Sequence, residues 1–237
     1  MRKPLAITAA LLAAILIAVI VIVIVIVIVR QPSAEQTTAT PTTAASATTE
    51  DDDQQLQQLL NTRLSTIGAQ LSVNLPATLT IDTANGDTVY ARVTMHELTK
   101  LPAHQSAAIL KERSALAGYD TVWTMPVSMT VLGIVDDAGT ATRATADVSA
   151  SDLSPFTIAT HPGSDPLPTS NTLSSPGCSG LDGHTAIAVG HTVTWCVHGF
   201  SDAATSAPTG GQYETVSGTY ATPITWASRK YAAPEIP

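Results

Sequence analysis

The sequence predicts a mainly β protein: an antiparallel β-sandwich preceded by an N-terminal transmembrane helix, a disordered linker and a short helix. Three observations predict this order. Residues 5–29 carry no charged side chain, and sixteen of the twenty residues after Arg30 are Thr, Ala, Ser or Pro. Beyond residue 72, apolar side chains recur at every second position in short runs separated by turn residues, which is typical of strands.

The first element is a transmembrane signal anchor over residues 5–29, with residues 1–4 as a cytoplasmic tail. A helix of this length rises about 37 Å, which is enough to cross a hydrocarbon core of roughly 30 Å. Its second half alternates Val and Ile, but a lone strand in lipid would leave its backbone unpaired, so we predict a helix. The alternative is a cleaved signal peptide, whose apolar core usually runs only about 7–15 residues.

Charge sets the orientation of this anchor. Arg2 and Lys3 precede it, whereas the single Arg30 follows it and acidic residues come after. Cytoplasmic flanks carry the excess of Lys and Arg, so the sequence predicts a single-pass protein of the cell membrane with its C-terminal domain extracytoplasmic. Cleavage of the segment would also leave that domain outside the cytoplasm.

Residues 30–50 form the predicted linker, and residues 51–71 form the predicted short helix. The linker holds no aromatic or large aliphatic side chain that could offset the entropy lost on ordering, so we expect it to be disordered. The acidic run Asp51–Asp53 opposes the dipole of the helix favourably, and a divalent-cation site is the alternative interpretation. In the helix, apolar residues recur every three or four positions: Leu56, Leu59, Leu60, Leu64, Ile67 and Leu71.

Residues 72–237 form the predicted extracytoplasmic β-sandwich domain. Asn85–Gly86 lies between two apolar runs and predicts a hairpin, because both residues tolerate positive φ. A long strand is expected from about Thr121 to Val135, with Pro126 at an edge or bulge position, since proline donates no ladder hydrogen bond. The remaining strands are expected over 140–148, 186–200 and 212–226.

The closing strands resemble those of a known family. The run Gly190–Val197 and the run Tyr220–Trp226 are similar to the last strands of immunoglobulin-like domains in Gram-positive bacterial surface proteins and lipoproteins of unknown function. The resemblance covers roughly residues 74–228. It implies an immunoglobulin-like β-sandwich with a binding or envelope-associated role, and it carries over no catalytic residue. Those relatives usually have a lipid-modified cysteine, which the transmembrane segment replaces here.

Cys178 and Cys196 are the only cysteines, and we predict a disulfide between them. It would close a loop of 19 residues and stabilise the fold by about 3 kcal/mol on the chain-entropy estimate. The alternative is a zinc site, because His184, His191 and His198 interleave with the cysteines as C-x5-H-x6-H-x4-C-x-H. Paired zinc ligands usually lie close together in the chain, and only Cys196 and His198 do so, so no metal or cofactor is predicted.

The charge of the predicted outer part excludes one class of partner. Residues 31–237 carry 8 basic and 19 acidic side chains, a net charge of −11. Such a surface repels the phosphates of nucleic acids. The expected partners are therefore the membrane and a protein or cell-envelope ligand.

Because the anchor, linker and sandwich come without a catalytic motif, we expect a non-enzymatic binding or envelope-associated protein. No Gly-x-Ser-x-Gly elbow occurs. The alternative is a membrane-anchored envelope hydrolase or metal-binding enzyme, in which His161 or His191 acts with an Asp and one of the many Ser residues. Trp123, Trp195 and Trp226 could stack sugars, but we expect them in the core.

Overall fold

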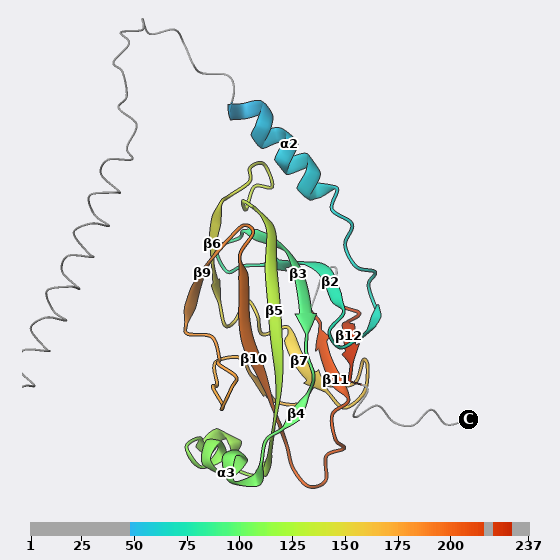
Figure 1. Ribbon diagram of the computed structural model, residues 1–237, viewed down its shortest axis with the longest axis vertical. Coiled ribbons are helices and arrows are strands. Elements are labelled where there is room, and N and C mark those ends of the chain that lie inside the picture. Colours follow the sequence, from blue (N-terminus) through green and yellow to red (C-terminus); the bar gives the residue numbers. More distant parts are fainter. Residues whose placement is uncertain (1–47, 216–219, 229–237) are drawn as a thin grey trace, which may run out of the picture. The chain divides into compact units, whose positions relative to one another are not determined.

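The computed structural model describes residues 48–215 and 220–228 of the chain (Figure 1). The predicted cytoplasmic tail, the transmembrane segment 5–29 and most of the linker 30–50 lie outside the described residues. Within the described ranges, no helix is long and apolar enough to span a membrane. The first described element is helix α2 (Thr48–Leu60).

Ten of the twelve strands in the described chain form two β-sheets. The six-stranded sheet, here called the large sheet, has the order β2-β3-β5-β10-β8, with β4 paired beside β5. All of its pairs are antiparallel. Its strands are β2 (Pro76–Asp82), β3 (Thr88–Met95), β4 (Thr99–Lys100), β5 (Thr121–Val135), β8 (Thr169–Ser170) and β10 (Thr192–Ser201).

The four-stranded sheet, here called the small sheet, has the order β1-β12-β11-β7, and β6 pairs with β9 separately. β1 is parallel to β12, and the other pairs are antiparallel. These strands are β1 (Gln70–Ser72), β6 (Thr145–Ser149), β7 (Phe156–Ala159), β9 (His184–Ala188), β11 (Gly210–Tyr213) and β12 (Ile224–Ala227). The remaining helices are α3 (Ala103–Lys111) and the 3-10 helix η1 (Ser114–Leu116).

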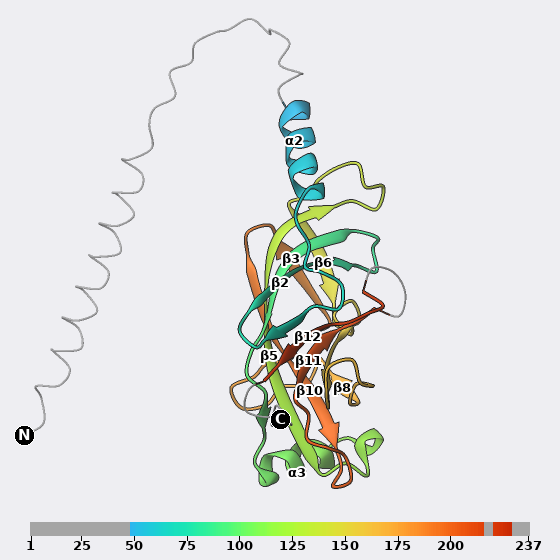
Figure 2. The same ribbon diagram turned by 90° about the vertical axis from the view of Figure 1, so that its right-hand side faces the viewer.

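The core lies between the large and the small sheet, which pack face to face (Figure 2). Alternate residues of β5, such as Met125 and Val127, are fully buried and belong to one cluster with aromatic side chains. The Phe156 ring centroid lies 4.5 Å from that of Tyr213 and 5.4 Å from that of Trp195. The predicted mainly β architecture of antiparallel sheets is confirmed.

The helix predicted over residues 51–71 is wrong in its second half. α2 ends at Leu60, and Gln70–Ser72 form β1 instead. Leu71 lies opposite Trp226 in the parallel pair of β1 with β12. A backbone ladder to a strand far along the chain therefore replaces the further helical turns that the apolar spacing predicted.

Pro126 lies at neither of its predicted positions, because β5 is an interior strand of the large sheet and its bulge falls elsewhere. Pro126 lies opposite Cys196 of β10. On its other side β3 ends at Met95 and β4 begins at Thr99, and the Pro126 carbonyl accepts a hydrogen bond from the His96 N–H at 2.9 Å. In a strand, the backbone N and O of one residue point to the same side of the strand. The N–H that Pro126 lacks would therefore also point to this gap between β3 and β4, where no strand residue needs it.

The free edge of β2 is closed by hydrogen bonds from outside the strand. The Oγ of Ser65 accepts from the Thr78 N–H at 2.9 Å, and the Ser65 N–H donates to the Thr78 carbonyl at 2.7 Å. The Thr80 N–H donates to the Tyr220 hydroxyl at 3.2 Å, and the Thr80 carbonyl accepts from the Tyr213 hydroxyl at 2.9 Å. Thr78 and Thr80 therefore have no free backbone N–H or carbonyl group at this edge with which another strand could pair.

Candidate functional site

The structure confirms the predicted disulfide between Cys178 and Cys196, whose Cα atoms lie 5.6 Å apart. Cys196 belongs to β10, and its N–H also donates to the Ser179 carbonyl at 2.9 Å. The bond therefore fixes the loop before β9 against the outward face of the large sheet. Because both sulfur atoms are used in this bond, neither is a thiolate ligand for zinc.

The structure does not bring the three candidate histidines together. His184 begins β9 and is exposed, and His191 is exposed in the turn between β9 and β10. His198 is fully buried in β10, with its Nε2 3.0 Å from the Ser175 Oγ. Within the described part of the chain, no group of three or more His, Cys, Asp or Glu side chains could hold a metal ion.

Burial sets the protonation state of His198. Loss of solvation is the main cause that lowers its pKa to about 4. The imidazole is therefore neutral near neutral pH. It acts as a hydrogen-bonding core residue under the disulfide-bonded loop, away from the two exposed histidines.

None of the three tryptophans offers a platform for a sugar, because each is buried. Trp195 and Trp226 are 1% and 0% exposed, and the Trp226 Nε1–H donates to the Leu75 carbonyl at 2.8 Å. Trp123 is 4% exposed, and its Nε1–H donates to the Ser201 Oγ at 2.9 Å. The expectation that these residues lie in the core is confirmed.

One serine and one histidine do meet in the geometry of a nucleophile and its base. The His96 Nε2 lies 2.8 Å from the Ser128 Oγ, and its Nδ1 lies 2.9 Å from the Asn74 Oδ1. Asn74 has a φ of 67°, a left-handed conformation that asparagine tolerates. Positions 74, 96 and 128 follow no sequence spacing, so only the fold could reveal this set.

The surroundings of Ser128 do not suit acyl transfer. Ser128 lies in the interior strand β5, between Thr94 of β3 and Thr194 of β10. Its neighbours along β5, Val127 and Met129, point into the core, so Ser128 points outward from a continuous sheet. Backbone N–H groups there serve the ladders to β3 and β10, whereas an oxyanion hole needs N–H groups aimed at the substrate.

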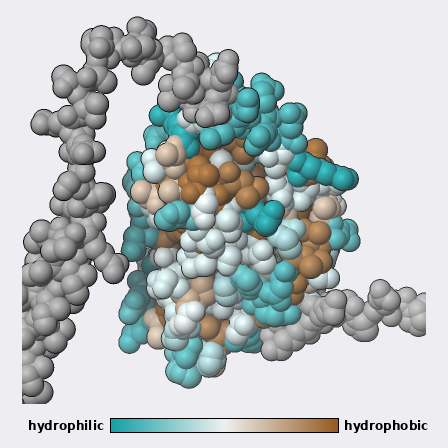
Figure 3. All heavy atoms as spheres, turned by 45° about the horizontal axis from the view of Figure 1, so that its top comes forward, coloured by the Kyte–Doolittle hydropathy of each residue, from teal (hydrophilic) through white to brown (hydrophobic). Residues whose placement is uncertain are grey.

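A groove of about 920 Å³ lies beside the end of α2, over the outward face of β3 and β5. We call it the helix groove. Figure 3 looks onto this end of the molecule, where apolar surface gathers between hydrophilic regions. The lining residues are Gln55, Gln58, Leu59, Thr62, Arg92, Leu132, Gly133, Ile134, Thr142, Arg143, Ala144 and Val189.

Gly133 makes room for α2 to dock and so creates one wall of the helix groove. A Cβ added at Gly133 would lie 2.5 Å from the Cδ2 of Leu59 and 2.6 Å from its Cδ1. Leu59 and Leu56 form a small buried cluster with Val135. A bulge in the pairing of β3 with β5 skips Leu132, which lines the groove. A glycine inside an apolar strand is a sequence signal for such a close approach.

The helix groove holds two arginines although the chain is acidic. Its described lining includes the side chains of Arg92 and Arg143 and no Asp or Glu. Arg143 is paired with Asp87, with 3.0 Å between Nε and Oδ1. No carboxylate of the described residues lies within 4.0 Å of the Arg92 guanidinium. Together with Val189, which is 43% exposed, the groove combines an apolar floor with a guanidinium that has no ion pair among the described residues.

Comparison with known proteins gives one distant structural similarity and no sequence match. No protein-family model matches the sequence, and no curated protein matches it. The chain is similar in structure to MPT63, a secreted protein from Mycobacterium tuberculosis, with 16% sequence identity and a TM-score of 0.42 over 69% of this chain and 99% of that chain. A likeness this distant carries no conclusion about function, so the fold assignment rests on the strands described above.

Proposed function

We propose that this chain is a membrane-anchored, non-catalytic binding protein of the cell envelope, with an immunoglobulin-like β-domain held outside the cytoplasm. The apolar segment 5–29 supports the single-pass anchor. The disulfide supports the compartment, because such bonds persist in oxidising environments. The anchor is followed by the linker and α2, so α2 would be the first ordered element after the membrane.

The helix groove is the binding surface in this proposal. The observation that carries it is an apolar floor beside Arg92, which has no ion pair among the described residues, in a groove whose described lining holds no Asp or Glu. Charge complementarity then favours one occupant, an apolar segment of a partner protein that bears a carboxylate. A nucleic acid would meet the acidic remainder of the domain and be repelled.

The test is photo-crosslinking of the full-length protein in intact cells. A photoreactive residue replaces Val189 at the groove, and a control replaces the exposed Ala107 on α3, at the opposite end of the β-domain (Figure 1). We expect a discrete adduct with one protein from position 189, reduced about tenfold by Arg92→Glu through lost charge attraction. The charge reversal Lys111→Glu on α3 is the matched control and should leave the adduct unchanged.

Equal adducts from both positions, or an adduct that Arg92→Glu leaves intact, would contradict the proposal. The crosslinked protein must also be acidic at the crosslinked segment, which mass spectrometry of the adduct shows directly. A nucleic acid or lipid adduct at position 189 would contradict the stated occupant.

A hydrolase is the second candidate, and the hydrogen-bonded set Asn74–His96–Ser128 is the observation that favours it. A fluorophosphonate probe labels serines that a neighbouring base activates. We expect no labelling of the full chain, because the strand around Ser128 lacks aimed N–H donors. Labelling that Ser128→Ala removes would replace the binding proposal with an enzymatic one.

A further inference from the structure

Helix α2 is attached to the β-domain through two side chains. Leu56 and Leu59 are each 7% exposed, whereas the other residues of the range 53–60 are exposed. The two leucines pack with Val135 and Tyr90 in a cluster separate from the main core. Residues 53–60 make no hydrogen bond or ion pair with a described residue of the β-domain. The attachment of α2 is therefore small and apolar.

Docking and folding of α2 belong to one equilibrium. The helix has 13 residues, and an isolated helix shorter than about 12–15 residues is marginal in water. Once Leu56 and Leu59 leave the β-domain, α2 therefore loses the packing that holds its helical conformation. The chain cannot move far, because Ser65 stays bonded to Thr78 at the edge of β2. α2 can thus detach and return without unfolding of the sheets.

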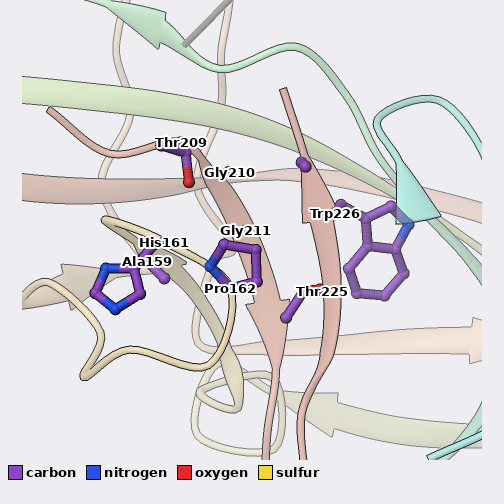
Figure 4. Close-up of a pocket in the computed structure, with 9 residues that line it drawn as sticks. Ala159, His161, Pro162, Thr209, Gly210, Gly211, Thr225 and Trp226 are labelled. Carbon is purple, nitrogen blue, oxygen red and sulfur yellow. The ribbon is translucent and has the colours of Figure 1, made fainter. Parts of the chain in front are cut away.

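The helix groove depends on this docking, because α2 forms one of its walls. Gln55, Gln58 and Leu59 line the groove from α2, and the β-domain supplies its floor. The volume of about 920 Å³ therefore exists only while α2 is in place. By contrast, the crevice between β11 and the turn at Pro162 (Figure 4) has no room for a water molecule and offers no site.

We propose that docking of α2 and binding of the partner in the helix groove are coupled, so that α2 acts as a removable wall. This inference rests on the binding function proposed above and names its regulation. The groove is complete only while α2 is docked, so the apparent affinity for the partner falls with the docked fraction. By reciprocity, an occupied groove holds α2 on the β-domain. The predicted linker enters the domain through α2, so a pull from the membrane side would act on this wall first.

The first test compares two leucine variants of α2. Leu56→Ala removes a docking contact without changing a side chain that lines the groove. The matched control is Leu60→Ala, because Leu60 is 48% exposed and does not line the groove either. Alanine favours a helix at least as well as leucine does, so the two variants differ in docking and not in helix propensity.

Two measurements are made on each variant. Hydrogen exchange of the full chain in lipid nanodiscs reports docking, and the photo-crosslinked adduct from position 189 in intact cells reports binding. We expect Leu56→Ala to raise exchange over residues 54–60 and to reduce the adduct about tenfold, because loss of a buried leucine lowers the docked fraction. Leu60→Ala should change neither.

The second test measures the reverse coupling. Both cysteines of the chain are joined in the disulfide, so Leu56→Cys adds a single free thiol at a position that is 7% exposed while α2 is docked. A membrane-impermeant maleimide then labels this thiol when α2 detaches. In intact cells, addition of Arg92→Glu should speed the labelling at least about threefold, because an empty groove no longer holds α2. In the purified full chain, without the partner, Arg92→Glu should leave the labelling rate unchanged.

The outcomes separate this coupling from the binding function. An adduct that Leu56→Ala leaves intact, although exchange over α2 rises, overturns the coupling and keeps the groove as the binding surface. An adduct that increases in Leu56→Ala also overturns it, because α2 would then block the groove. Unchanged exchange in Leu56→Ala overturns the attachment through two leucines. Absence of any adduct from position 189 in the otherwise unchanged chain overturns the binding function itself, and the coupling with it.

Discussion

His198 couples proton binding to the folding of the protein. Its pKa is about 4 in the folded state, because of burial, against an ordinary value of 6.5. Between these values the unfolded chain binds more protons than the folded chain, so the free energy of unfolding falls as the pH falls from 6.5 towards 4. Protonation of His198 changes the free energy of unfolding by roughly 3 kcal/mol in all. Above pH 6.5 the stabilisation from the neutral imidazole is fully present.

Urea unfolding of the full chain in detergent at pH 7.0 and pH 4.5 measures this effect. His198→Gln keeps a hydrogen-bonding group for Ser175 but has no proton to bind, so we expect a weaker dependence of stability on pH. His184→Gln is the matched control, because His184 is exposed and its variant should keep the full dependence. An unchanged dependence in His198→Gln contradicts the assignment to this residue.

At the scale of the elements, Gly133 decides whether α2 stays docked. In Gly133→Val the new side chain occupies the place of the Leu59 methyl groups, so we expect α2 to detach while β5 keeps its ladders. Hydrogen exchange should rise over residues 54–60, and the unfolding midpoint of the β-domain should change little. Leu59→Ala should also loosen α2, since burial of an apolar side chain is lost.

The double variant Gly133→Val with Leu59→Ala separates crowding from other effects. Removing the Leu59 methyl groups makes space for the new valine, so the two changes together should raise exchange less than the sum of the single changes. Strict additivity would show that Gly133 and Leu59 do not interact.

Local patterns predicted the elements whose contacts are local or periodic. The alternation of Val89, Ala91 and Val93 predicted a strand, and all three side chains are buried. Asn85–Gly86 predicted the β2–β3 hairpin, and Gly86 has a φ of 89°. The disulfide was predicted from the presence of only two cysteines in an expected oxidising compartment and from a histidine spacing that fits zinc poorly.

Elements and sites that depend on distant pairing could not be predicted. Leu71 fits a helical spacing with Leu64 and Ile67, and only its ladder to Trp226 makes it a strand residue. His96 meets Ser128 only because β3 and β5 are neighbours at one register. Gly133 is a signal of the helix groove that the predicted strand Thr121–Val135 left unused, since glycine weakens a strand unless another group approaches it.

At the scale of the whole molecule, the disulfide joins the loop before β9 to the large sheet and covers His198. Reduction, or the double variant Cys178→Ala with Cys196→Ala, should lower the free energy of unfolding by about 3 kcal/mol. It should also weaken the dependence of stability on pH, because a freed loop lets water reach His198. Urea unfolding with and without reductant at both pH values measures the two effects together, and equal midpoints in all conditions contradict this prediction.

The closed edge of β2 has a consequence for the membrane-anchored form proposed above. Copies attached to one membrane would meet one another far more often than copies free in solution, and a bare strand edge would then act as a seed for polymerisation. Ser65, Tyr213 and Tyr220 occupy the hydrogen-bonding groups through which one copy would recruit the next. In that form, crowded copies would stay separate, each with its helix groove open to the proposed partner.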